Sequence, residues 1–290
     1  MQNKKTITTL VIFIILFAVI ATLAGILSNS GDGEYEYKSI HGQTIKIYGK
    51  GLYQHMSSDV AIQGIAQDYV TLLVAIPFLL FALYRSINGS LTGKYMLAGV
   101  LNYIFLTYLF YMNMAMYNYL FLVYVTLTGL SFFALALTLL SIETNQLLVI
   151  FKNTTHNKFI GGFLIFNALS IALLWLGVVV PPLLDKTIVP LAVDHYTTLT
   201  VQAFDLSIFL PISFVAGFLL IKKNKFGYLI APVYLVFLSL LMIALIAKII
   251  AMAMAGVNVI PAVFIIPCIT FVAIVCGVIL IKSIDENVAI

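Results

Sequence analysis

Two charged residues stand inside long apolar runs of this sequence, where a charge is costly. Asp205 lies in the run 199–221 and Lys248 in the run 227–255. Each costs about 3 kcal/mol inside a bilayer, even on a lenient insertion scale. At 1.5 Å per residue, Asp205 is about 9 Å and Lys248 about 12 Å below the same predicted surface. The matching depths predict an ion pair, direct or bridged by water. This pair either holds two helices together or lines a cavity. The alternative is that the Lys248 side chain extends alone to the membrane–water interface.

Further polar residues gather at the same level. Four of them fall at i, i+4, i+8 and i+11, which is one helical face if a helix begins near the first: Asp194, Thr198, Gln202 and Asp205. Such a stripe must face protein or water, because lipid offers it no hydrogen bonds. Two more polar residues, Asp68 and Asn113, lie at the corresponding ends of the second and third apolar runs. We therefore predict a ligand pocket from seven residues: Asp68, Asn113, Asp194, Thr198, Gln202, Asp205 and Lys248.

The usual catalytic and cofactor motifs are missing from the sequence. It has no P-loop, G-x-G-x-x-G, H-E-x-x-H, G-x-S-x-G or C-x-x-C, and we expect no cofactor. His55, His195 and Asp194 lack metal-ligand spacing, so we expect solvated histidines and no metal. Asp194 and His195 are adjacent, point apart on a helix and make a poor acid–base dyad.

The elements that carry these residues are set by composition. The chain has 290 residues, of which 62% are hydrophobic and 9% charged, and a mean hydropathy of +1.11. Soluble domains are near a quarter charged. Lipid must therefore be the solvent, and the net charge of +4 indicates no nucleic-acid partner.

Eight apolar runs are long enough to span a bilayer. They cover residues 6–28, 69–85, 95–117, 119–142, 159–183, 199–221, 227–255 and 260–281. We predict an all-α integral membrane protein, a single bundle of eight transmembrane helices over residues 1–290. Its third and fourth spans form a tight hairpin around 116–119. The sequence shows no internal repeat, and an inverted repeat of four plus four helices stays open.

Basic residues predict the orientation. With the N-terminus inside, ten fall in inner segments: Lys4, Lys5, Arg85, Lys94, Lys152, Lys158, Lys222, Lys223, Lys225 and Lys282. Four fall outside: Lys38, Lys46, Lys50 and Lys186. By the positive-inside rule, both termini are cytoplasmic, and we expect a plasma (inner) membrane location. The first span could be a signal peptide, but its apolar core of about 18 residues exceeds the usual 7–15 and favours an uncleaved anchor.

The long polar loop 29–67 would then lie outside. Residues 45–48 alternate as a strand does, Gly49 and Gly51 suit a tight turn, and 52–55 would return as the second strand of a hairpin. Residues 57–69 predict a short interfacial helix. Since a lone hairpin is marginal in water, its apolar residues Ile45, Ile47 and Leu52 should pack on the bundle as a cap.

These features predict an outward-facing pocket, closed on the cytoplasmic side, that binds or transports a small molecule or lipid. The inner half carries no intramembrane charge, which weakens a channel or pump. Two alternatives stay open. One is a sensory or scaffold subunit that works through a partner protein. The other is a membrane enzyme at the outer leaflet, although the carboxylates and histidines are sparse for one.

Overall fold

The computed structural model describes residues 3–114, 116–151 and 156–287. Eight helical spans in these residues are long and apolar enough to cross a membrane, which confirms the predicted all-α bundle of a polytopic membrane protein. The first four spans are α1 (Lys4–Leu27), α2 with α3 (Ser58–Val70 and Ile76–Ile87), α4 (Leu91–Met114) and α5 (Phe121–Leu140). The last four are α7 (Asn157–Leu184), α8 with α9 (Thr200–Phe204 and Leu210–Ile221), α10 (Lys225–Met254) and α11 (Ala262–Lys282).

The surface of the bundle is apolar, as a lipid solvent requires. On α1, one face is fully buried at Ile7, Val11 and Ile14, while large residues such as Phe13 and Leu16 are about half exposed on the other. The spacing of three and four residues places each set on its own side of the helix. The inner face packs on protein and the outer face suits hydrocarbon chains.

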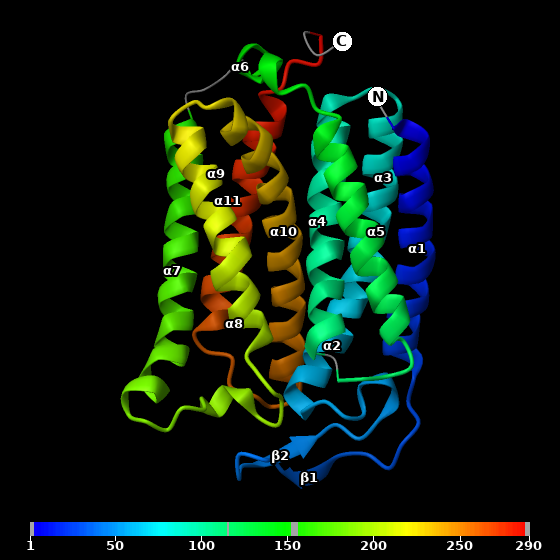
Figure 1. Cartoon of the computed structure of the whole chain (residues 1–290), viewed down its shortest axis with the longest axis vertical. Helices are drawn as coiled ribbons and strands as arrows, with labels where there is room; N and C mark the ends of the chain where they lie inside the picture. Colours follow the sequence, from blue (N-terminus) through cyan, green and yellow to red (C-terminus); the bar gives the residue numbers. More distant parts are fainter. Residues whose placement is uncertain (1–2, 115, 152–155, 288–290) are drawn as a thin grey trace.

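The bundle is made of two groups of four spans (Figure 1). The helices α1 to α5 form one group and α7 to α11 the other, and corresponding spans run in the same direction. The third span of each group, α4 and α10, packs against the other at the centre of the molecule. These two are the most buried spans.

The two groups repeat one local structure. Each second span contains one wide π turn, Thr71–Ala75 in the first group and Asp205–Phe209 in the second. A proline, Pro77 or Pro211, follows each turn at the same distance. Proline has no N–H for the preceding turn and its ring crowds the carbonyl four residues before, so a widened turn relieves both effects.

The tight turn between the second and third spans repeats as well. A Cβ built on Gly93 would lie 2.5 Å from the Ser86 nitrogen, and one on Gly227 would lie 2.4 Å from the Leu220 nitrogen. The interval between Gly93 and Gly227 equals that between Pro77 and Pro211. The two groups therefore share these local features in parallel order, and the inverted repeat left open by the sequence is wrong, because corresponding spans run in the same direction.

The segments after the fourth and eighth spans repeat and cross between groups. They read Ser-Ile-Glu-Thr-Asn from Ser141 and Ser-Ile-Asp-Glu-Asn from Ser283. Lys225 at the start of α10 donates to Asn145 Oδ1 of the first group at 2.9 Å. Reciprocally, Glu286 of the second group accepts from the backbone nitrogens of Leu91 and Thr92 at the start of α4, both at 2.9 Å. Each tail thus ties its own group to the third span of the other.

A small two-stranded sheet lies at one end of the bundle (Figure 1). Strand β1 (Tyr35–Lys38) pairs antiparallel with β2 (Thr44–Ile47). The predicted strand at 45–48 is therefore present, but its predicted partner is wrong. Gly51–Tyr53 forms a 3₁₀ turn, because both Gly49 and Gly51 take positive φ and redirect the chain, which returns only as a single bridge from Ile47 to Ser57.

The segment after the sheet rests on α1. Ile47 and Leu52 are buried and Ile45 is half-buried, and Leu52 is part of the apolar core of the bundle. The predicted helix at 57–69 is present as α2, but its interfacial position is wrong, because α2 continues through the π turn into α3 as one span, Ser58–Ile87. The polar residues of 57–69 are therefore part of the bundle and not of its rim.

Basic residues divide between the two ends as the sequence predicts. Helix directions place most at the end that carries α6 (Leu147–Ile150), for example Arg85 at the end of α3 and Lys223 before α10. Lys38, Lys46, Lys50 and Lys186 lie at the end that carries the sheet. Lys152 is outside the described residues.

Candidate functional site

A cavity of about 520 Å³ lies between the two groups and extends towards the end that carries the sheet. Its walls come from α2 and α4 of the first group and from α7, α8, α10 and α11 of the second. On α4 the lining begins past the middle of the helix, at Leu106, and on α10 it begins about a third of the way along, at Tyr234. Five of the seven predicted site residues line it: Asp194, Thr198, Gln202, Asp205 and Lys248.

Lys248 projects into this cavity from α10 with no direct partner. The side chain is half-buried, and no described residue forms a hydrogen bond or an ion pair with it. The carboxylates of Asp68 and Asp205 are near enough to attract its charge. The direct ion pair of Asp205 with Lys248 is therefore not formed, but the two residues line the same cavity.

Asp205 is held by the only tryptophan of the chain. It is the first residue of the second π turn, and its Oδ2 accepts a hydrogen bond from Trp175 Nε1 of α7 at 2.9 Å. Its other oxygen, Oδ1, accepts none from the described residues. The carboxylate is thus fixed in direction and still has a free acceptor towards the cavity.

Gln67 on α2 is a second anchored group of the wall. Its Nε2 donates to Tyr103 at 2.7 Å and to Thr107 at 3.1 Å, and Tyr103 also bonds Thr71 at 3.1 Å. The side chain is only 3% exposed, and no described residue donates a hydrogen bond to its Oε1, which is also shut off from the cavity. A buried acceptor without a donor costs about 1–3 kcal/mol, so Gln67 is held in place by its Nε2 contacts at the expense of its oxygen.

Asp68 is buried beside the cavity and does not line it. Tyr53 donates to its Oδ2 at 2.5 Å and Tyr111 to its Oδ1 at 3.2 Å. Space for the carboxylate comes from Gly25, where a Cβ would meet Asp68 Oδ2. Tyr111 lines the cavity and therefore stands between it and Asp68.

Asn113 and the single polar stripe differ from the prediction. Asn113 is exposed and donates to Leu109 of its own helix at 2.7 Å, so it is not part of the cavity. The helix begins only at Thr200, and Asp194 ends a 3₁₀ turn with φ of 55°. The stripe residues still meet at the cavity, because a loop and not a helical face brings Asp194 there.

Asp194 and its neighbours form the mouth of the cavity. Burial raises the pKa of Asp194, and a hydrogen bond from Ser57 and the charge of His195 lower it in part. The Ser57 nitrogen donates to Tyr196 at 3.2 Å, and His195 Nε2 bonds the His55 carbonyl at 2.9 Å. No group of three metal-ligating side chains occurs in the described part of the chain.

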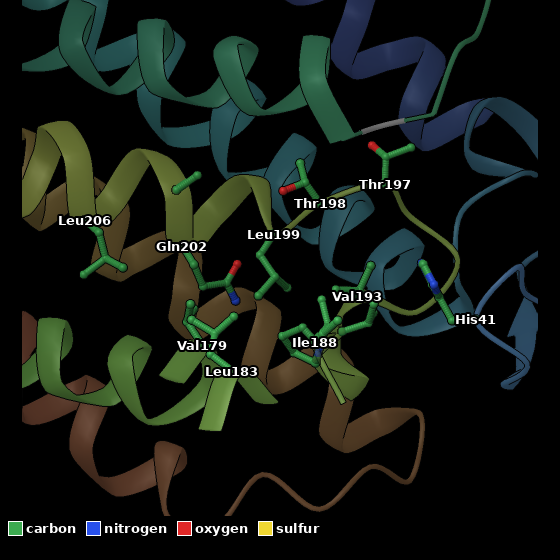
Figure 2. A pocket seen from close by; sticks show the side chains of 13 residues that line it. His41, Val179, Leu183, Ile188, Val193, Thr197, Thr198, Leu199, Gln202 and Leu206 are labelled. Carbon is green, nitrogen blue, oxygen red and sulfur yellow. The ribbon is translucent and has the colours of Figure 1, made fainter. Parts of the chain in front are cut away.

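A second cavity of about 350 Å³ shares a wall with the first. Figure 2 shows Leu199 and Gln202 of the α8 segment pointing towards Val179 and Leu183 of α7, with His41 of the β1–β2 turn at the edge. Thr198, Leu199 and Gln202 line both cavities. The segment that contains Thr198, Leu199 and Gln202 thus separates the cavity of about 520 Å³ from the cavity of about 350 Å³.

Trp175, Gln67 and Tyr53 are not among the site residues predicted from the sequence. Trp175 had one signal, because it is the only tryptophan of the chain and stands in an apolar run. Nothing in the sequence marks Gln67 or Tyr53 as a site residue, since each lies in the segment 29–67 assigned to the polar loop.

Comparison of the chain with protein-family models, with curated proteins and with solved structures finds no match.

Proposed function

We propose that this polytopic protein binds a small molecule in the cavity between its two groups and carries it across or into the membrane. One observation supports this most directly. Lys248 and Asp205 face one cavity without forming an ion pair, although each would be stabilised by a counter-charge. An intramembrane charge left open towards a cavity is typical of a ligand pathway.

The cavity is closed towards the other end of the bundle. There Phe151 packs between Tyr95 and Tyr228, with ring centroids 6.1 Å and 4.7 Å apart. Tyr228 accepts a hydrogen bond from Asn157 at 2.7 Å. With the sheet end outside, as the basic residues favour, the site is outward-facing with an aromatic seal on the cytoplasmic side.

The repeat supports a change of access. Transporters built from repeats place the substrate between the repeats, where one half can rock against the other. The two π turns lie at corresponding positions in the second spans, and each is a local break in regular helix geometry beside a proline. We propose that they act as hinges.

Trp175 offers a direct test, because it contacts Asp205 and is the only tryptophan. The purified protein should carry a small molecule that mass spectrometry detects after denaturation. Returning this molecule to the stripped protein should change Trp175 fluorescence. Lys248→Met should weaken binding at least tenfold, and Lys186→Met, a surface change near the same end, should not.

A folded protein that carries no small molecule, and whose Trp175 signal responds to no solute or lipid fraction, would contradict the proposal. Uptake into proteoliposomes then separates transport from binding alone.

A further inference from the structure

We propose that the ligand is a small zwitterion with an apolar body, carrying a carboxylate and a primary ammonium as an apolar α-amino acid does. This inference rests on the proposed function and adds the chemical class of the ligand. It follows from which hydrogen bonds the cavity leaves open.

Lys248 requires an acceptor. Its ammonium has three N–H donors, and none of the described residues accepts from it. A carboxylate on the ligand would provide both the negative charge and the acceptor oxygens.

One acceptor on the wall requires a donor. Asp205 Oδ1 accepts no hydrogen bond from the described residues, while Trp175 holds Oδ2. A primary ammonium has three N–H groups and a positive charge, so it can both donate to this carboxylate and balance its charge. A quaternary ammonium, which has no N–H, would leave Oδ1 without a donor.

The other carboxylates near the cavity do not require a second cationic group on the ligand. Asp68 accepts one hydrogen bond on each oxygen, from Tyr53 and from Tyr111, and does not line the cavity. Asp194 lies at the mouth. The two free charges inside, on Asp205 and Lys248, are opposite, so a ligand with zero net charge preserves the balance. A simple anion or a simple cation would satisfy only one of them.

The remaining wall defines the body of the ligand. It is built largely of aliphatic and aromatic side chains, such as Leu106, Phe110, Ile171 and Phe237. A cavity of about 520 Å³ falls in the range of sites for small ligands. A mostly apolar enclosure that also carries Asp205 and Lys248 suits a molecule with a charged head and an apolar side chain.

The test uses four probes with the same branched apolar body: L-leucine, 4-methylpentanoate without the amine, 3-methylbutylamine without the carboxylate, and 4-methylpentan-1-ol without either charge. The full-length protein is placed in nanodiscs of phosphatidylglycerol, and Trp175 fluorescence is titrated. We expect leucine to bind at least tenfold more tightly than each of the other three.

Two variants make the result specific. Asp205→Asn should weaken leucine at least tenfold and leave 4-methylpentanoate within twofold, whereas Lys248→Met should weaken leucine and leave the amine within twofold. Lys186→Met is the control and should change none of the affinities. In nanodiscs of phosphatidylethanolamine, weaker leucine binding would show that a zwitterionic lipid head occupies the same site.

The proposal is overturned if the acid or the amine alone binds as tightly as leucine, which would leave the cavity a binding site of another class. A Trp175 signal that moves with none of the four probes, in either lipid, would also overturn it. Only the absence of any detectable ligand in the earlier experiment would overturn the proposed function.

Discussion

Asp68 shows how a buried carboxylate is accommodated without a direct ion pair. Its oxygens accept hydrogen bonds from two tyrosines, and no described cation lies within ion-pair distance of it. Hydrogen bonds to a charged or buried polar group offset the loss of water at that group. The cost is steric, since the carboxylate occupies the place that a side chain on α1 would otherwise fill.

Gly25→Ala should therefore destabilise the protein. The added Cβ would meet Asp68 Oδ2 and lie 2.8 Å from the Tyr53 hydroxyl, so the buried network must shift. We expect a loss of about 1–3 kcal/mol in the free energy of unfolding, measured by denaturant titration in mild detergent.

Gly177→Ala is the matched control, because it also lies inside a helix but has no atom within 4 Å of the added Cβ. Alanine should there be neutral or stabilising by up to about 1 kcal/mol. Equal effects of the two substitutions would show that the Gly25 contact is unimportant.

At the scale of elements, the two short turns between second and third spans depend on close backbone approach. Gly93→Ala and Gly227→Ala should each cost about 1–3 kcal/mol, because the new Cβ would lie within 2.5 Å of backbone nitrogen. Gly162→Ala, with no atom within 4 Å, should cost little. The same denaturant titration applies, and a loss at only one of the two turns would contradict their equivalence.

The hydrogen bonds of Glu286 at the start of α4 predict that the stability of the protein depends on pH. Burial alone would raise the pKa of Glu286, but hydrogen bonds from Thr92, Ser90 and Leu91 outweigh it and lower the pKa below its ordinary value. A lowered pKa in the folded state means that the carboxylate stabilises the fold above the unfolded pKa of about 4.5. This contribution is lost as the pH falls through the lower folded value.

Glu286→Gln should accordingly lower the melting temperature at pH 7 and have a smaller effect near pH 3. The difference between the native protein and the variant, followed from pH 7 to pH 3, is the measurement. A difference that stays constant over this range would show that the charge of Glu286 contributes nothing.

At the scale of the whole molecule, the orientation can be tested directly. In a background with Cys268 and Cys276 replaced by alanine, single cysteines at Lys50 and Lys186 should react with an impermeant thiol reagent on intact cells. One at Lys223 should react only after lysis, because the basic residues favour that end as cytoplasmic. Labelling at Lys223 in intact cells would reverse the orientation and the outward-facing site.

The repeat also explains why two similar groups need each other. The central helices α4 and α10 are the most buried spans, and each contributes its apolar surface to the other group. The crossing tails at Asn145 and Glu286 fasten the end opposite the cavity. The end with the cavity is joined differently, by hydrogen bonds from the Ser57 nitrogen to Tyr196 and between His195 and the His55 carbonyl.

The sequence by itself determined the solvent, the number of spans and the division of basic residues between the two ends. These follow from composition and from runs of about 20 apolar residues, which act locally. It also identified Asp205 and Lys248, because a charge in an apolar run stands out whatever the fold.

Only the tertiary structure determined which side chains contact one another at the site and which strands pair. Tyr53 meets Asp68, Trp175 meets Asp205, and Gln67 meets Tyr103 and Thr107, and no local spacing in the sequence encodes these contacts. The strand at 45–48 pairs with 35–38, because positive φ at Gly49 and Gly51 turns the chain away from the expected partner. The repeat stayed hidden because lipid-facing positions accept any apolar residue, so only a few glycines, prolines and polar ends retain the pattern.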